Sequence, residues 1–114
     1  MIEIIEHTGR RLKLRCRGRG ASTSTCTLDL DRNVAEISRA LVIPYRHTRV
    51  ELSNVHDVVV RKEDRRKDYQ PVFELRVGRV VSLGGYTKDD ALEAARAIRD
   101  FLREHRKAPT PSPP

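Results

Sequence analysis

Residues 11–17 have the sequence RLKLRCR, in which apolar and cationic side chains alternate. Because successive side chains of a β-strand point to opposite faces of the sheet, this alternation predicts a strand with an apolar inner face and a basic outer face. The same two-residue period is kept by apolar residues on both sides of this stretch: Ile2, Ile4, Leu12, Leu14, Cys16, Cys26, Leu28 and Leu30. Three antiparallel strands joined by two hairpins are therefore expected in the first 30 residues.

The hairpins have predictable registers. A three-residue loop at residues 7–9 would place Ile4 opposite Leu12. The second reversal, centred in the glycine-containing loop, would place Cys16 opposite Cys26 and put all the apolar side chains on one face. We interpret both thiols as core residues. Their oxidation is the alternative that this geometry allows, but thiols in an intracellular chain normally stay reduced.

Further extended segments follow, separated by residues typical of turns. The sequence predicts strands at residues 35–45, 56–62, 71–77 and 80–83, a short extended piece at 50–55, turns at 31–33 and 78–79, and a charged hairpin tip at 63–68. Within residues 71–77, Phe73, Leu75 and Val77 are expected on one face. About seven strands result.

The periodicity changes after Tyr86. Thr87 followed by Asp90 is a variant of the capping box, which predicts a helix start. The apolar residues then recur at steps of three and four: Ala91, Leu92, Ala95, Ile98, Phe101 and Leu102. We interpret this stripe as the face that covers the core, with membrane-surface or partner binding as the alternative. The final APTPSPP predicts a disordered or polyproline tail.

Short motifs carry a resemblance to a known superfold. They are Ile43-Pro44, the segment of residues 50–58, and Leu83-Gly84-Gly85-Tyr86-Thr87 followed by the helix. This order resembles the pleckstrin-homology-like superfold, in particular its small bacterial members. The resemblance implies an α+β, mostly β fold: about seven antiparallel strands in a sandwich or partly open barrel, capped by one C-terminal amphipathic helix. We therefore expect one domain at residues 1–105, and the composition of the C-terminal end predicts a proline-rich tail at 106–114.

Positive charge is the strongest signal outside the core. The chain has 23 Lys and Arg against 16 Asp and Glu, for a formal net charge of +7, which favours anionic partners. The outer face of the basic strand and the loop after it supply candidate anion-binding residues: Arg11, Lys13, Arg15, Arg17 and Arg19. Alternate residues on a strand are ~6.5–7 Å apart, close to the spacing of successive phosphates. The alternative is a solvated face without a ligand.

No motif for catalysis is present. The sequence lacks a nucleophile elbow, a phosphate-binding P-loop and a zinc-protease motif. The two cysteines are not in a CxxC pair, and the four histidines have no ligand spacing. We therefore expect no enzyme activity, no cofactor and no metal.

Three binding functions remain. The first is a non-catalytic adaptor that binds a protein or peptide at an exposed strand, or in the groove between a sheet edge and the helix. The second is binding of an anionic lipid headgroup, and the third is binding of nucleic acid, for which an aromatic content of 4% is low. The sequence contains no apolar run long enough for a membrane span and no secretory signal pattern, so we expect a cytoplasmic protein, or one peripheral to the membrane.

Overall fold

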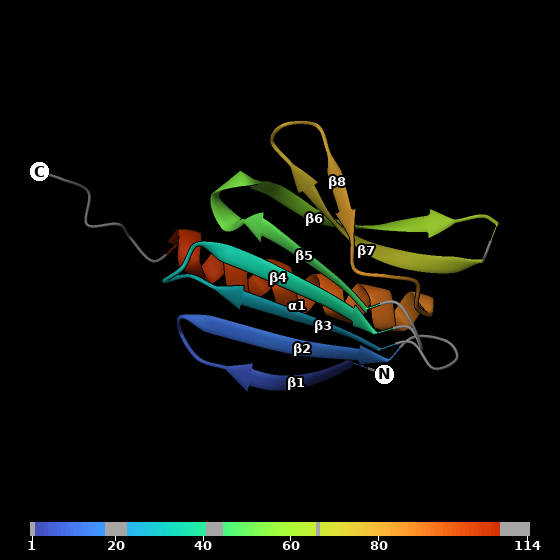
Figure 1. The fold of residues 1–114 in the computed structure, drawn as a ribbon, viewed down its shortest axis with the longest axis horizontal. Helices are drawn as coiled ribbons and strands as arrows, with labels where there is room; N and C mark the ends of the chain where they lie inside the picture. The colour runs from blue at the N-terminus through green and yellow to red at the C-terminus, as the bar shows by residue number, and fades with distance from the viewer. Residues whose placement is uncertain (1, 18–22, 41–44, 66, 108–114) are drawn as a thin grey trace, which may run out of the picture.

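The computed structural model describes residues 2–17, 23–40, 45–65 and 67–107, and these residues form two antiparallel sheets and one helix (Figure 1). The expected mostly β fold with a C-terminal helix is confirmed. The elements are β1 (Ile2–His7), β2 (Arg11–Arg17), β3 (Thr23–Asp29), β4 (Val34–Ala40), β5 (Tyr45–Glu51), a 3-10 turn (Leu52–Asn54), β6 (Val55–Glu63), β7 (Asp68–Leu75), β8 (Val80–Ser82) and α1 (Lys88–Lys107).

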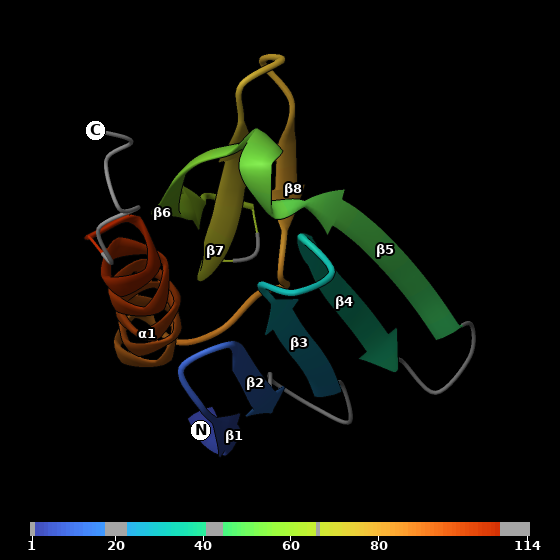
Figure 2. The same cartoon turned by 90° about the vertical axis from the view of Figure 1, so that its left-hand side faces the viewer.

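The two sheets are consecutive along the chain. Strands β1 to β5 form one meander in sequence order, and β6, β7 and β8 form the other. Helix α1 contacts β1 and β2 of the first sheet and β6 and β7 of the second. Figure 2, which looks nearly along the helix, shows α1 lying across one side of both sheets.

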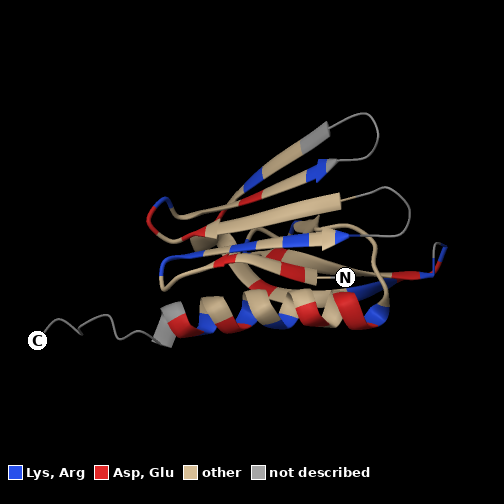
Figure 3. Cartoon of the chain, turned by 90° about the horizontal axis from the view of Figure 1, so that it is seen from below, with Lys and Arg blue, Asp and Glu red and all other residues tan. Residues whose placement is uncertain are grey.

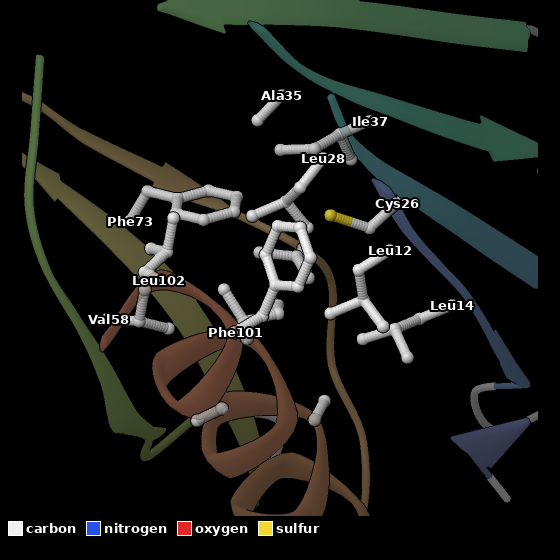
Figure 4. Packing of buried hydrophobic residues seen from close by; sticks show 14 of the residues in the cluster. Leu12, Leu14, Cys26, Leu28, Ala35, Ile37, Val58, Phe73, Phe101 and Leu102 are labelled. Atoms are coloured by element: carbon white, nitrogen blue, oxygen red, sulfur yellow. The ribbon is translucent and has the colours of Figure 1, made fainter. Parts of the chain in front are cut away.

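The core lies between the helix and the inner faces of the two sheets (Figure 4). The alternation of β2 is confirmed, because Leu12, Leu14 and Cys16 are buried while Arg15 between them is exposed. The helical stripe is buried as expected, except for Leu92, which is 43% exposed. The buried side chains from both sheets and the helix include Leu12, Leu14, Cys16, Cys26, Leu28, Ala35, Ile37, Val55, Val58, Phe73, Ala91, Ala94, Ala95, Ile98, Phe101 and Leu102.

The first hairpin differs in register from the prediction. Ile4 lies opposite Leu14 instead of Leu12, and the register shifts between Ile4 and Glu6, which makes a β-bulge. The loop itself is fixed by Thr8, whose side-chain oxygen accepts hydrogen bonds from the backbone of the two residues before Leu12. The bulge brings His7 opposite Leu12, where its ring lies edge-on against Phe101, with the ring centroids 6.1 Å apart.

The predicted pairing of Cys16 with Cys26 is also wrong. Strands β2 and β3 continue to the pair Arg17 and Thr23, so Cys16 lies opposite Ser24 and Cys26 lies opposite Leu14. The thiols remain on the same face but are diagonal neighbours, a relationship that typically separates Cα atoms by about 7–8 Å. That separation exceeds what a disulfide normally spans, and both cysteines are free.

The predicted strand at 35–45 is wrong in extent, because the chain forms two strands there. β4 ends at Ala40, residues 41–44 lie outside the described residues, and β5 begins at Tyr45. The described part of the chain therefore has eight strands instead of about seven. The middle of β5, RHTR, has no alternation of apolar and polar residues, so periodicity could not identify it.

The 3-10 turn joins the two sheets and is held from both sides. Asn33 has a positive φ of 53° and exchanges side-chain hydrogen bonds with Ser53, at 3.0 and 3.1 Å. On the other side, the backbone N–H of Arg76, the residue after β7, donates to the carbonyl of Asn54 at 2.9 Å, and the Arg76 side chain donates to the carbonyl of Ser53. These contacts fix the direction in which the chain enters β6.

The C-terminal part shows one further correction. β7 ends at Leu75, so Val77 lies in the following turn and is 66% exposed, instead of on the inner face with Phe73. The helix start is confirmed, since the side-chain oxygen of Thr87 accepts the backbone N–H of Asp90 at 3.2 Å. α1 extends to Lys107, so residues 106 and 107 of the predicted tail at 106–114 belong to the helix, and residues 108–114 lie outside the described residues.

Candidate binding surfaces

The structure places four of the five candidate anion-binding residues together. Arg11, Lys13, Arg15 and Arg17 alternate with the buried residues of β2, so they share its outer face. Arg19 lies outside the described residues. Figure 3 shows the blue bands of this strand beside the red bands of β1.

Carboxylates from the neighbouring strands partly neutralise this basic face. Glu3 of β1 forms an ion pair with Arg15 at 3.3 Å, and Glu6 approaches Arg11 at 3.7 Å. On the other side, Asp29 of β3 lies opposite Arg11. The face is therefore mixed in charge. Strand alternation could predict this for Glu3, whereas Glu6 reaches the same face only through the bulge between Ile4 and Glu6.

A second surface is the groove between β6 and α1. It contains two cavities of about 310 and 470 Å³. The smaller is lined by Val55, His56, Asp57, Val58, Arg99, Leu102 and Arg103, and the larger by Val60, Leu92, Ala95, Arg96, Arg99, Asp100 and Arg103. The two cavities share Arg99 and Arg103, so they are adjacent parts of one groove. The floor is apolar and the helical wall is cationic.

The cationic wall follows from helical spacing. Arg96, Arg99 and Arg103 are three and four residues apart, which places them on one side of α1. Arg96 and Arg103 make no hydrogen bond or ion pair with any described residue, and both are exposed. None of these arginines was among the residues that the sequence predicted for binding. Their common spacing was visible, but only the fold shows that this side of the helix faces a sheet edge.

β6 is the edge strand beside this groove. The carbonyl of Val58 accepts a hydrogen bond from Arg99, and its backbone N–H donates to the carboxylate of Asp57 at 2.8 Å. The backbone groups of Val58 therefore point away from β7. Because backbone direction alternates along a strand, the N–H and C=O groups of Val60 and Lys62 also point away from β7. These groups make no hydrogen bond with a described residue.

Two buried hydroxyls and one carbonyl form a structural cluster in the interior. The hydroxyls of Ser24 and Tyr86 are 2.6 Å apart, and both lie within 2.9 Å of the carbonyl oxygen of Leu83. Burial raises the pKa of the Cys16 thiol to about 11, and burial likewise raises the pKa values of Cys26 and Tyr86. These groups stay protonated near neutral pH, so the thiols are poor nucleophiles.

Within the described ranges, no group of three or more His, Cys, Asp or Glu side chains is arranged to hold a metal ion. The described part of the chain also contains no helix with the length and apolar character needed to cross a bilayer. Comparison of the chain with protein-family models, with curated proteins and with solved structures gives no match. The assignment of function therefore rests on the two surfaces described above.

Proposed function

We propose that this chain is a non-catalytic binding module that takes up an extended segment of a partner protein by strand addition to β6, in the groove beside α1. The observation that carries this proposal is the open backbone at Val60 and Lys62 next to a cavity of about 470 Å³. Strand addition gives affinity through main-chain hydrogen bonds, while alternate side chains of the added segment enter pockets.

The groove offers both kinds of contact. Ala95 and the partly exposed side chains of Val60 and Leu92 provide an apolar surface for alternate side chains of the added strand. The outer face of β2, by contrast, already has acidic neighbours for its cations. For this reason we place peptide binding before binding of anionic lipid or nucleic acid.

We propose in addition that the fold is a pleckstrin-homology-like variant. Its support is the order of two antiparallel sheets followed by a C-terminal helix that covers both. The departure is the extra strand, since five strands precede the second sheet. A groove between a sheet edge and the terminal helix is consistent with a role in binding.

The test uses Val60→Pro, with Val60→Ala as its control. Proline removes the outward N–H of Val60 without removing a hydrogen bond to β7, because that N–H does not point toward β7. The alanine variant shortens the side chain and keeps the N–H. The probe is the synthetic peptide TVEVEVT, added to isotope-labelled protein and followed by amide chemical shifts.

We expect shifts concentrated at Val60, Lys62 and the Arg96–Arg103 side of α1. Val60→Ala should bind within about threefold of the natural chain, whereas Val60→Pro should lose about tenfold or more, as expected for a missing backbone hydrogen bond in a short ladder. Shifts confined to another surface, or equal binding by both variants, would reject strand addition at β6.

A further inference from the structure

Arg99 occupies the position that a partner strand would need. Its guanidinium donates to the carbonyl of Val58, where the N–H of an added strand would otherwise donate. Its Nε atom also lies 3.9 Å from the carboxylate of Asp57, which itself accepts the N–H of Val58. Both outward backbone groups of Val58 are thus satisfied by side chains of the same chain.

We propose that Arg99 is a latch that keeps this part of the β6 edge closed to neutral segments and opens it for an acidic segment of a partner protein. The inference rests on the proposed function. It adds the class of ligand, namely an extended peptide with carboxylates at alternate positions. It also adds the residue that determines the selectivity.

The latch is held by contacts that can be exchanged. The side chain of Arg99 is 45% exposed and that of Asp57 is 48% exposed, so water reaches both. An ion pair with this exposure adds little stability. A carboxylate of an added strand can accept two parallel hydrogen bonds from the guanidinium, a stronger arrangement than one bond to a neutral carbonyl. A backbone N–H of the added strand then donates to the carbonyl of Val58 in place of Arg99.

Movement of Arg99 would also join the two cavities. Arg99 lines both of them, with Val58 and Asp57 on one side and Val60 and Ala95 on the other. Once the guanidinium turns toward a ligand carboxylate, the added strand can extend from Val60 to the carbonyl of Val58, while the N–H of Val58 stays with Asp57. A longer ladder then becomes available to the acidic ligand.

The neighbouring charges favour an acidic occupant. Arg96 and Arg103 flank Arg99 on the same side of the helix and have no ion pair with a described residue. Two carboxylates, Asp57 and Asp100, also line the groove and oppose an anion. The carboxylate of Asp57 already accepts the N–H of Val58 and lies near Arg99. The positive charge of the three arginines therefore exceeds the negative charge of the two carboxylates that line the groove.

The experiment compares two peptides, acidic TVEVEVT and neutral TVQVQVT, on the natural chain and on Arg99→Met and Arg103→Met. We expect the natural chain to bind the acidic peptide about tenfold more tightly, the effect of one strong charge-assisted contact. Arg99→Met should raise the affinity for the neutral peptide about threefold or more and lower the affinity for the acidic one. Arg103→Met should lower only the affinity for the acidic peptide.

The outcomes separate the latch from the proposed function. If Arg99→Met leaves the affinity for the neutral peptide unchanged, Arg99 is no latch, even if strand addition occurs. If neither peptide shifts the amides of Val60 and Lys62 in any variant, the proposed function fails with it. The natural chain offers a further test by NMR. The Nε–Hε resonance of Arg99 should shift when the acidic peptide is added and stay in place with the neutral peptide. An equal shift with both peptides contradicts the latch.

Discussion

Leu83 donates its backbone N–H to the carbonyl of Pro71 at 2.9 Å, and Pro71 has no N–H with which to return the bond. The carbonyl of Leu83 is left free by this missing donor and accepts hydrogen bonds from the hydroxyls of Ser24 and Tyr86. Since Ser24 belongs to the five-stranded sheet and Pro71 to the three-stranded sheet, one proline creates a polar connection between them.

The two hydroxyls should act as substitutes for one another. In Ser24→Ala the Tyr86 hydroxyl still reaches the carbonyl of Leu83, and in Tyr86→Phe the Ser24 hydroxyl does so. Each single variant should lower the free energy of unfolding by about 0.5–1.5 kcal/mol. The double variant leaves a buried carbonyl without a donor and should cost about 1–3 kcal/mol more than the sum of the two. Urea denaturation measures this, and additive losses would show that the hydroxyls are independent.

Alkaline pH should destabilise the protein through its buried acids. Burial raises the pKa of Cys16 from 9.0 to about 11, so between these values the unfolded thiol has lost its proton while the folded thiol keeps it. Stability is therefore intact below pH 9 and falls as pH rises, by up to about 1.4 kcal/mol per pH unit for each such group.

Cys26 and Tyr86 shift in the same direction and should steepen the decline. Denaturation measured at steps of about one pH unit between pH 8 and pH 11 tests the slope. Cys16→Ala is the control. It should lower the free energy of unfolding at every pH, and it should make the decline with pH less steep because one titrating group is removed. An unchanged slope in that variant would contradict the assignment.

A methyl group at Gly85 should cost less stability when Asp68 is removed. A Cβ atom at Gly85 would lie 2.0 Å from a carboxylate oxygen of Asp68, so the carboxylate must move. We expect Gly85→Ala to lower the free energy of unfolding by about 1–3 kcal/mol, the usual cost of overpacking. In the Asp68→Ala background the same change should cost about 1 kcal/mol less. Gly9→Ala, where no atom lies within 4 Å, is the matched control.

The basic face of β2 should gain anion affinity when its acidic neighbours are neutralised. Combined Glu3→Gln and Glu6→Gln substitutions remove the carboxylates that approach Arg15 and Arg11. We expect the variant to elute from a cation-exchange column at higher salt than the natural chain, because more basic side chains can contact the anionic groups of the column and release their counterions. Glu93→Gln with Glu104→Gln on α1 changes net charge equally at another site and should have a smaller effect.

The same surface has a direct test as a ligand site. Replacing Arg11, Lys13 and Arg15 by Ser should lower retention on anionic liposomes or on DNA if this face binds either, and the loss should be largest at low ionic strength. Unchanged retention on both would reject the anion-binding proposal. Peptide binding at β6 should be unaffected by these substitutions.

Much of the fold follows from local periodicity, and the errors have physical reasons. Alternation identified the inner face of β2 and β3, and the apolar stripe with its Thr87 cap identified α1. Register was wrong in both hairpins because alternation is unchanged by a shift of two residues. β5 was missed because its middle is polar on both faces.

The candidate groove was harder to predict in detail. A sheet edge beside the helix was predicted as a binding region, but the strand that forms this edge could not be identified from the sequence. The spacing of Arg96, Arg99 and Arg103 identifies one side of a helix, and only the tertiary arrangement brings that side to β6. The contact of Arg99 with Val58 joins residues 41 positions apart, beyond the reach of any local pattern.

The position of α1 after both sheets has a consequence for synthesis on the ribosome. The apolar faces of the two sheets are translated before the helical residues that cover them, such as Ile98 and Phe101. Until then Leu12, Leu28 and Phe73 have no helix to bury them, and exposed apolar sheet surface promotes aggregation. A nascent chain of this protein should therefore be a substrate for chaperones until residue 102 has left the exit tunnel.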